Sequence, residues 1–195
     1  MIRRMLAVST AVLFVFTALP RSADAQSVYV LAGASVPTSD YGDAFKTGWL
    51  AAAGVTFPIG EAGLWAGAEG LYGQNSFDST ESTDLKGKPY SIMAILGYDI
   101  PTEGKINPYV WGGAGLMGLR QTSGGESTSD SGFGWQFGAG LALATAGRVS
   151  PFVEGRYQSA SITPGDSSES ATVGLFGIEA GISIGLGSND DMDGM

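Results

Sequence analysis

Eight stretches of the chain alternate between apolar residues and small or polar residues with a period of two, and no other feature limits the fold as strongly. Successive side chains of a β-strand point to opposite faces, so this period predicts strands. The stretches cover residues 27–36, 46–57, 64–74, 89–100, 107–120, 133–144, 151–161 and 172–186. Neither a helical period nor a solenoid repeat is found after residue 26. The sequence therefore predicts an all-β domain.

The segments between these stretches alternate between short and long. Residues 58–63, 101–106 and 145–150 are short and contain the turn formers Gly and Pro. The other connectors, among them "QNSFDSTESTDLKGK" and "QTSGGESTSDSG", are longer or more polar and are predicted to be solvated loops. This arrangement indicates an antiparallel up-and-down barrel with short turns at one end and larger loops at the other. Most stretches also have the ~9–11 residues that a tilted strand needs to cross a bilayer.

The charged residues distinguish a membrane barrel from a soluble one. In each stretch one phase is apolar and carries no charge in its central part, as in "YSIMAILGYDI". The opposite phase holds Glu69, Asp99, Gln136, Glu154, Arg156, Glu179 and Ser183. An apolar exterior and a polar interior are typical of a transmembrane β-barrel. We therefore predict an eight-stranded antiparallel up-and-down transmembrane β-barrel; the first stretch is apolar on both phases, so its faces stay unassigned.

The N-terminus predicts export. Arg3 and Arg4 precede an apolar run and the small-residue site Ala23-Asp24-Ala25, which is the layout of a cleavable signal peptide over 1–25. A membrane-anchoring helix is the alternative, but the apolar run is shorter than the ~20 residues that a span needs. The barrel is then expected over 26–186, followed by an acidic periplasmic tail over 187–195.

Composition excludes several classes of function. The net charge of −9 argues against nucleic acid as a partner, because phosphate binding needs clustered Lys and Arg. The chain contains no Cys and no His, so disulfides, thiolate metal sites and the commonest general base are excluded. The aspartates of the tail lack the spacing of a calcium loop. We expect no metal and no cofactor.

Aromatic residues are predicted to form two groups. With both termini on the periplasmic side, the lipid-facing aromatics make one girdle toward each rim of the barrel. The outer girdle contains Trp49, Tyr72, Tyr90 and Trp135, and the inner girdle contains Phe57 and Tyr98. The large residues of the lumen phase all begin odd-numbered strands and should plug the periplasmic end; they are Trp65, Tyr109, Trp111 and Phe152. The many glycines of the lumen phase should leave water pockets in the upper and middle lumen.

Four lumen charges form the candidate site. Arg156 is the only basic residue on a lumen phase well inside a strand, and Glu69, Glu154 and Glu179 share that interior. We expect Arg156 to pair with at least one of these glutamates, and we favour Glu69 or Glu179 over Glu154, its neighbour on the same strand. In the alternative, each glutamate is hydrated separately and Arg156 reaches toward the loops.

The segments "NPYVWGGAGLMGLR" (107–120), "PFVEGRYQSAS" (151–161) and "LFGIEAGISIGL" (175–186) resemble the small eight-stranded outer-membrane barrels of Gram-negative bacteria, the OmpA/OmpX-like group. The resemblance covers essentially all of 26–186. It implies a monomeric barrel in outer-membrane lipid, inserted by the outer-membrane assembly machinery. Members usually end on an aromatic residue that this machinery recognises, whereas this chain continues past Leu186.

The expected function is non-enzymatic. No G-x-S-x-G nucleophile motif occurs, and histidine is missing as a base. A structural role or a surface interaction with extracellular or envelope ligands through the loops is the main hypothesis. A narrow channel or carrier for small, even apolar, molecules is the alternative, although eight strands enclose a lumen that side chains can fill.

Overall fold

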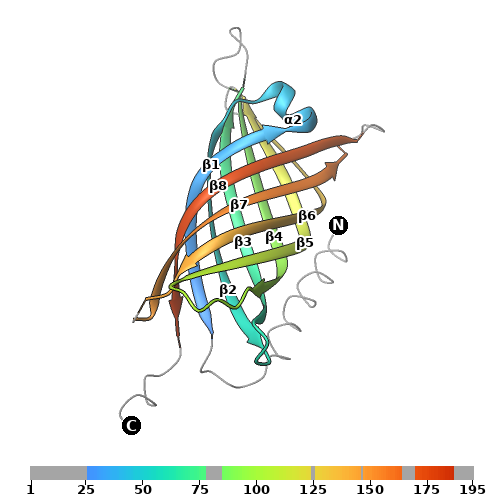
Figure 1. Cartoon of the computed structure of the whole chain (residues 1–195). Helices are drawn as coiled ribbons and strands as arrows, with labels where there is room; N and C mark the ends of the chain where they lie inside the picture. Colours follow the sequence, from blue (N-terminus) through green and yellow to red (C-terminus); the bar gives the residue numbers. More distant parts are fainter. Residues whose placement is uncertain (1–25, 78–84, 124–125, 146, 164–169, 187–195) are drawn as a thin grey trace, which may run out of the picture.

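The computed structural model is a closed barrel of eight antiparallel strands, each paired with its neighbours in the chain and the last with the first (Figure 1). It describes residues 26–77, 85–123, 126–145, 147–163 and 170–186. The predicted signal peptide and acidic tail lie outside these residues. The strands are β1 Ser27–Thr38, β2 Gly48–Ile59, β3 Leu64–Ser76, β4 Lys86–Asp99, β5 Ile106–Ser123, β6 Glu126–Leu143, β7 Val149–Ile162 and β8 Ala171–Gly185.

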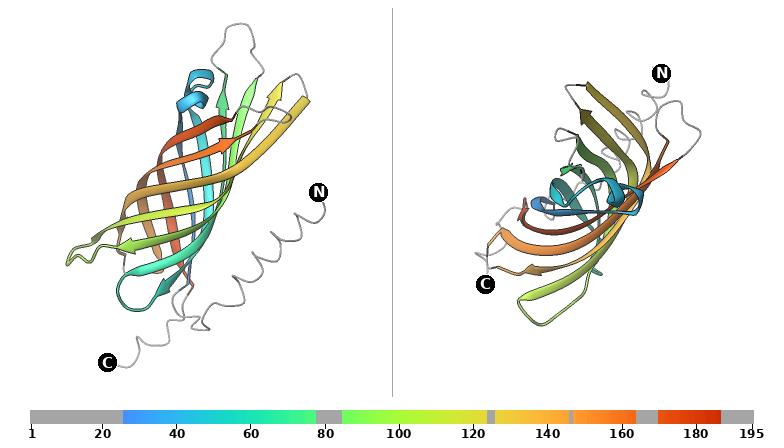
Figure 2. Two further views of the ribbon diagram at one scale, coloured as in Figure 1. Left: turned by 90° about the vertical axis from the view of Figure 1, so that its right-hand side faces the viewer. Right: turned by 90° about the horizontal axis from the view of Figure 1, so that it is seen from above.

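All eight predicted strands are confirmed, and two of them are much longer than the alternation indicated. β5 and β6 pair as far as Ser123↔Glu126, so most of the polar segment "QTSGGESTSDSG" forms a hairpin and not the loop we expected. The reason is that the apolar alternation ends where the hairpin leaves the apolar band, while the backbone pairing continues into solvent. Figure 2 shows this hairpin in yellow.

A short helix is the second departure. α2, Ser39–Ala44, lies in a segment that we expected to be a loop (Figure 1). Its six residues are too few to show a helical period. Tyr41 of α2 and the following Phe45 are both buried, with ring centroids 4.5 Å apart. Burial raises the pKa of the Tyr41 hydroxyl, which therefore stays protonated over the physiological range. The helix lies over the mouth of the barrel at the end of the long connectors (Figure 2).

The alternation of side chains between lumen and exterior is as predicted. Lipid-phase residues are well exposed, with Ile92 at 62% and Ile178 at 63%, while their neighbours in the lumen phase are buried. The structure also orients β1: Leu31 and Ser35 are buried and Val30 is exposed, so Tyr29 and the other odd-numbered residues face the lumen. The sequence could not show this because Val, Leu and Ala occupy both phases of β1.

The outer half of the lumen is filled by closely packed side chains. The apolar residues Leu50, Met93, Met117 and Leu175 come from four different strands and are each at most 1% exposed, and polar residues such as Asn75 and Gln158 are buried with them. This packing contradicts the water pockets expected in the upper lumen. The glycines that face the lumen leave room for these side chains and for aromatic rings.

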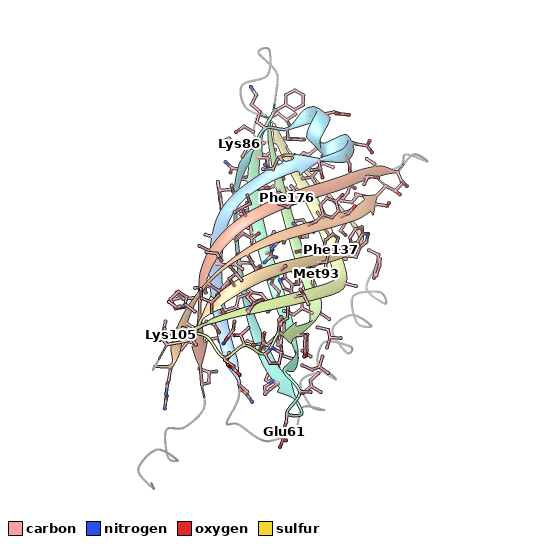
Figure 3. All side chains as sticks on the ribbon, in the orientation of Figure 1. Glu61, Lys86, Met93, Lys105, Phe137 and Phe176 are labelled. Carbon is pink, nitrogen blue, oxygen red and sulfur yellow. The ribbon has the colours of Figure 1, made fainter. Side chains whose placement is uncertain are left out.

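Charged side chains lie at the two rims or inside the barrel. In Figure 3, Lys86 is at the end of the long connectors and Glu61 and Lys105 are at the end of the short turns, while Phe137 and Phe176 lie on the wall between them. Among the described residues there is no helix with the length and apolarity that a bilayer crossing requires.

Candidate functional site: the lumen charge cluster

Arg156 occupies the middle of the lumen because its neighbours on both adjacent strands are glycines. It pairs with Gly138 of β6 and with Gly177 of β8. An added Cβ at Gly177 would meet Cγ of Arg156 at 3.0 Å. Gly177 therefore leaves space for the long side chain, while the Trp111 ring covers Gly138 and lies 4.9 Å from the guanidinium carbon. Arg156 is only 1% exposed.

The guanidinium group of Arg156 binds all three predicted glutamates. Its Nη1 and Nη2 donate to the two carboxylate oxygens of Glu69, at 2.6 and 3.0 Å. Nη2 also donates to Oε1 of Glu154 at 2.8 Å, and Nε donates to Oε2 of Glu179 at 2.8 Å. The structure thus brings together the four residues that we expected to share the interior. It adds Glu154, which lies two residues from Arg156 on the same face of β7, to the partners we had favoured.

Bidentate binding to Glu69 joins opposite walls of the barrel. Glu69 lies on β3 and Arg156 on β7, four strands away. Glu154 and Glu179 are direct cross-strand partners, an arrangement in which like charges destabilise a sheet. Arg156 offsets that repulsion by binding both carboxylates. The cluster therefore acts as a cross-brace whose removal would leave buried carboxylates unpaired.

Three neutral side chains complete the coordination of the carboxylates. Tyr29 donates its hydroxyl to Oε2 of Glu69 at 2.8 Å, and Tyr109 donates to Oε2 of Glu154 at 2.7 Å. The amide of Gln136 donates to Oε1 of Glu69 at 3.2 Å. The alternation had placed Gln136 in the lumen without assigning it a partner. Tyr29 was missed because β1 could not be oriented from its sequence.

Each large aromatic side chain of the inner lumen lies over a glycine on the neighbouring strand. A Cβ on that glycine would collide with the ring in every case. The cross-strand pairs are Tyr29↔Gly54, Trp65↔Gly97, Trp111↔Gly138, Tyr109↔Gly140 and Phe152↔Gly181. The rings consequently lie along the barrel wall and do not cross the lumen.

This arrangement corrects the expected plug. Trp65, Tyr109, Trp111 and Phe152 do gather at the end of the short turns, but they line a cavity of about 260 Å³ there. Glu69 and Glu154 form part of its wall, and the rim residue Asp99 accepts a hydrogen bond from Nε1 of Trp65 at 3.2 Å. The barrel is thus filled at the outer end and hollow at the short-turn end, which is the reverse of our expectation.

The expected girdle residues lie on the outer surface, and several contact one another. Trp49 packs on Tyr72 with centroids 6.0 Å apart, and Trp135 stacks on Phe137 at 5.7 Å. The hydroxyl of Tyr90 shares a hydrogen bond with Ser129. Phe57 and Tyr98 lie near the inner ends of β2 and β4. Phe137, which we had not assigned to a girdle, belongs to the same aromatic surface.

The comparisons with known proteins agree with this fold. A family model described as the outer membrane protein beta-barrel domain matches residues 8–181. The chain belongs to this family. As an outer-membrane barrel it lies in the lipid bilayer of the outer membrane, with its short turns on the periplasmic side. The cavity therefore lies at the periplasmic end.

Three solved outer-membrane barrels align with this chain, and Neisserial surface protein A shares its fold. Neisserial surface protein A aligns with a TM-score of 0.66 and 19% identity, over 82% of this chain and 96% of that protein. OprG from Pseudomonas aeruginosa has a TM-score of 0.49 and 12% identity, over 83% and 97%. Ail of Yersinia pestis has a TM-score of 0.47 and 20% identity, over 83% and 99%. No curated protein matches the chain.

Within the described residues, no group of three or more Asp, Glu, His or Cys side chains has the geometry to hold a metal ion. The cluster that exists is instead organised around a guanidinium group. Its chemistry is ionic pairing and hydrogen bonding inside a narrow lumen.

Proposed function

We propose that this outer-membrane barrel is a non-enzymatic surface protein that binds extracellular or envelope ligands through its outer hairpins. One observation carries the proposal: the outer part of β6 extends beyond its pairing with β7. Its pairing with β7 ends at Gly134↔Ala160, whereas its pairing with β5 continues to Glu126. Among the described residues, the stretch 127–129 of β6 is therefore paired with β5 and not with β7.

A strand edge of this kind presents backbone donors and acceptors to an added strand. The side chains along it are small and polar, and Ser127, Thr128 and Ser129 are exposed. They place no bulky or basic group in the path of an approaching peptide. The filled outer lumen supports the same function, because it leaves the surface as the part that is available from outside.

The experiment removes the projecting hairpin while leaving the barrel unchanged. Replacing residues 121–128 by Asn-Gly closes the hairpin at the Arg120↔Ser129 pair with a two-residue turn. Cells that display the shortened protein should adhere less to host-cell or matrix surfaces than cells that display the full chain. A matched control replaces the turn at 102–105, which is at the periplasmic end, with a turn of equal length. Equal adhesion of the full-length and shortened proteins would contradict the proposal.

A second candidate is a narrow channel or carrier for small molecules, and the periplasmic cavity favours it. The cavity reaches Glu69 and Glu154, close to the middle of the lumen. It stops below the apolar residues that fill the outer half. Unitary ion currents across a planar bilayer would favour the channel, and their absence would favour the surface function.

A further inference from the structure

The periplasmic cavity has the size and the shape of a site for one small molecule. Its volume of about 260 Å³ lies just below the ~300–1,000 Å³ range that is typical of ligand pockets. The cavity extends from the charge cluster to the periplasmic ends of the strands. Rim residues such as Ser27, Pro58, Asp99 and Ser150 line its outer part.

Aromatic rings from four strands form part of its wall. Phe152 stands edge-on to Tyr29 and to Tyr109, with ring centroids 6.2 and 6.4 Å apart, and Trp65 and Trp111 complete the lining. Aromatic faces attract ammonium groups, more strongly when the site is shielded from water. Hydrogen bonds to Glu69, Glu154 and Asp99 hold three of these rings in place. The site is therefore preformed, which lowers the entropic cost of binding.

The charge of the wall selects for cations. Glu69, Glu154 and Asp99 line the cavity, and no Lys or Arg is among its lining residues. Arg156 lies behind two of these carboxylates and is outnumbered by three glutamates within its own cluster. Three carboxylates and one guanidinium group leave the cluster with an excess of negative charge. An anion would be repelled from such a cavity.

One ring of the wall already contacts a cation. Trp111 lines the cavity, and the guanidinium carbon of Arg156 lies 4.9 Å from the centroid of its ring. The aromatic surface of this lumen is thus compatible with a positive charge. We propose that the periplasmic cavity binds a small organic cation that carries an ammonium group. This site is independent of the outer hairpin and goes beyond the surface function proposed above.

Tryptophan fluorescence of the full chain in detergent micelles tests the proposal. The chain has four tryptophans, and only Trp65 and Trp111 line the cavity. In a Trp49→Phe, Trp135→Phe background, choline should change the emission in a saturable way. Its neutral carbon isostere, dimethylbutanol, should bind at least about tenfold more weakly because it lacks the charge. Tetramethylammonium carries the same charge and should also bind in a saturable way.

Two variants that each lose one negative charge test whether choline binds in the cavity. Asp99→Asn removes a rim carboxylate of the cavity without touching the buried cluster, and it should weaken choline binding severalfold. Glu103→Gln removes a carboxylate from the exposed turn at the same end and should leave binding unchanged. The absence of a saturable response to choline, or equal binding of the neutral isostere, would overturn the proposal.

Discussion

At the scale of single residues, glycine decides where the large side chains of this barrel can lie. Arg156 extends between Gly138 and Gly177, and the rings of Trp111 and Tyr109 cover Gly138 and Gly140. A lumen of eight strands has little spare volume, so each large side chain needs a neighbour without one. The glycines we had linked to water pockets therefore accommodate side chains.

Removing the guanidinium group should cost much more than removing a surface arginine. Arg156→Met leaves three buried glutamates without their common partner, and we expect a loss of roughly 3–5 kcal/mol in the free energy of unfolding. Arg120→Met, which changes an exposed arginine of β5, should stay within about 0.5 kcal/mol. Urea unfolding in lipid vesicles measures both. In the double variant with Glu69→Gln the two losses should be clearly non-additive; strict additivity would contradict the Arg156–Glu69 pairing.

A methyl group added at a covered glycine should destabilise the barrel. The Cβ of Gly138→Ala would lie 2.8 Å from the Trp111 ring and 2.8 Å from the backbone oxygen of Gly155. Such overpacking typically costs about 1–3 kcal/mol. Gly112→Ala is the matched control, because its Cβ would meet only the oxygen of Gln136, at 3.5 Å. The same unfolding measurement applies, and equal effects of the two changes would show that the ring does not need the glycine.

At the scale of elements, β6 shows what the sequence could and could not predict. Its central part, with Trp135, Phe137 and Ala139 facing lipid and Gln136 facing the lumen, alternates clearly and was predicted correctly. Its polar outer part was predicted to be a loop, because periodicity reveals a strand only where one face is apolar. The four lumen charges followed from phase alone. Their contacts with Tyr29 and the cavity beside them depend on the register between neighbouring strands. The alternation within a single strand does not reveal that register.

A charge on the lipid face of β6 should separate the membrane-embedded part from the projecting part. Ala139→Arg places a charge in the apolar band and should cost about 2–4 kcal/mol near the midplane. Thr128→Arg, on the exposed hairpin of the same strand, should be nearly neutral. Folding yields into lipid vesicles report both effects. Cysteine at 139 should react with a lipid-phase reagent and cysteine at 138 should not; the opposite labelling pattern would reverse the assignment of the faces.

At the scale of the whole molecule, the barrel is closed in two ways. The sheet is closed around its circumference, and packed side chains close the lumen along its axis. β1 pairs with β8 from Ser27↔Gly185 to Thr38↔Gly174, so the sheet has no free edge over this length. Along the axis, the cross-brace of Arg156 lies below the apolar packing of the outer half. Backbone pairing around the closed circumference compensates for the lack of disulfides. It also leads to the expectation that the unboiled protein migrates anomalously on a gel.

The axial closure predicts that the refolded protein does not conduct ions. Leu50, Met93, Met117 and Leu175 are almost unexposed in the outer lumen, so an ion leaving the periplasmic cavity would meet a barrier of closely packed side chains. Planar bilayers containing the full-length protein should show no unitary current steps at any voltage they tolerate. Insertion is verified on the same preparation by the change in gel mobility on boiling. Reproducible unitary steps from correctly inserted protein would contradict the closed lumen and favour the channel over the surface role.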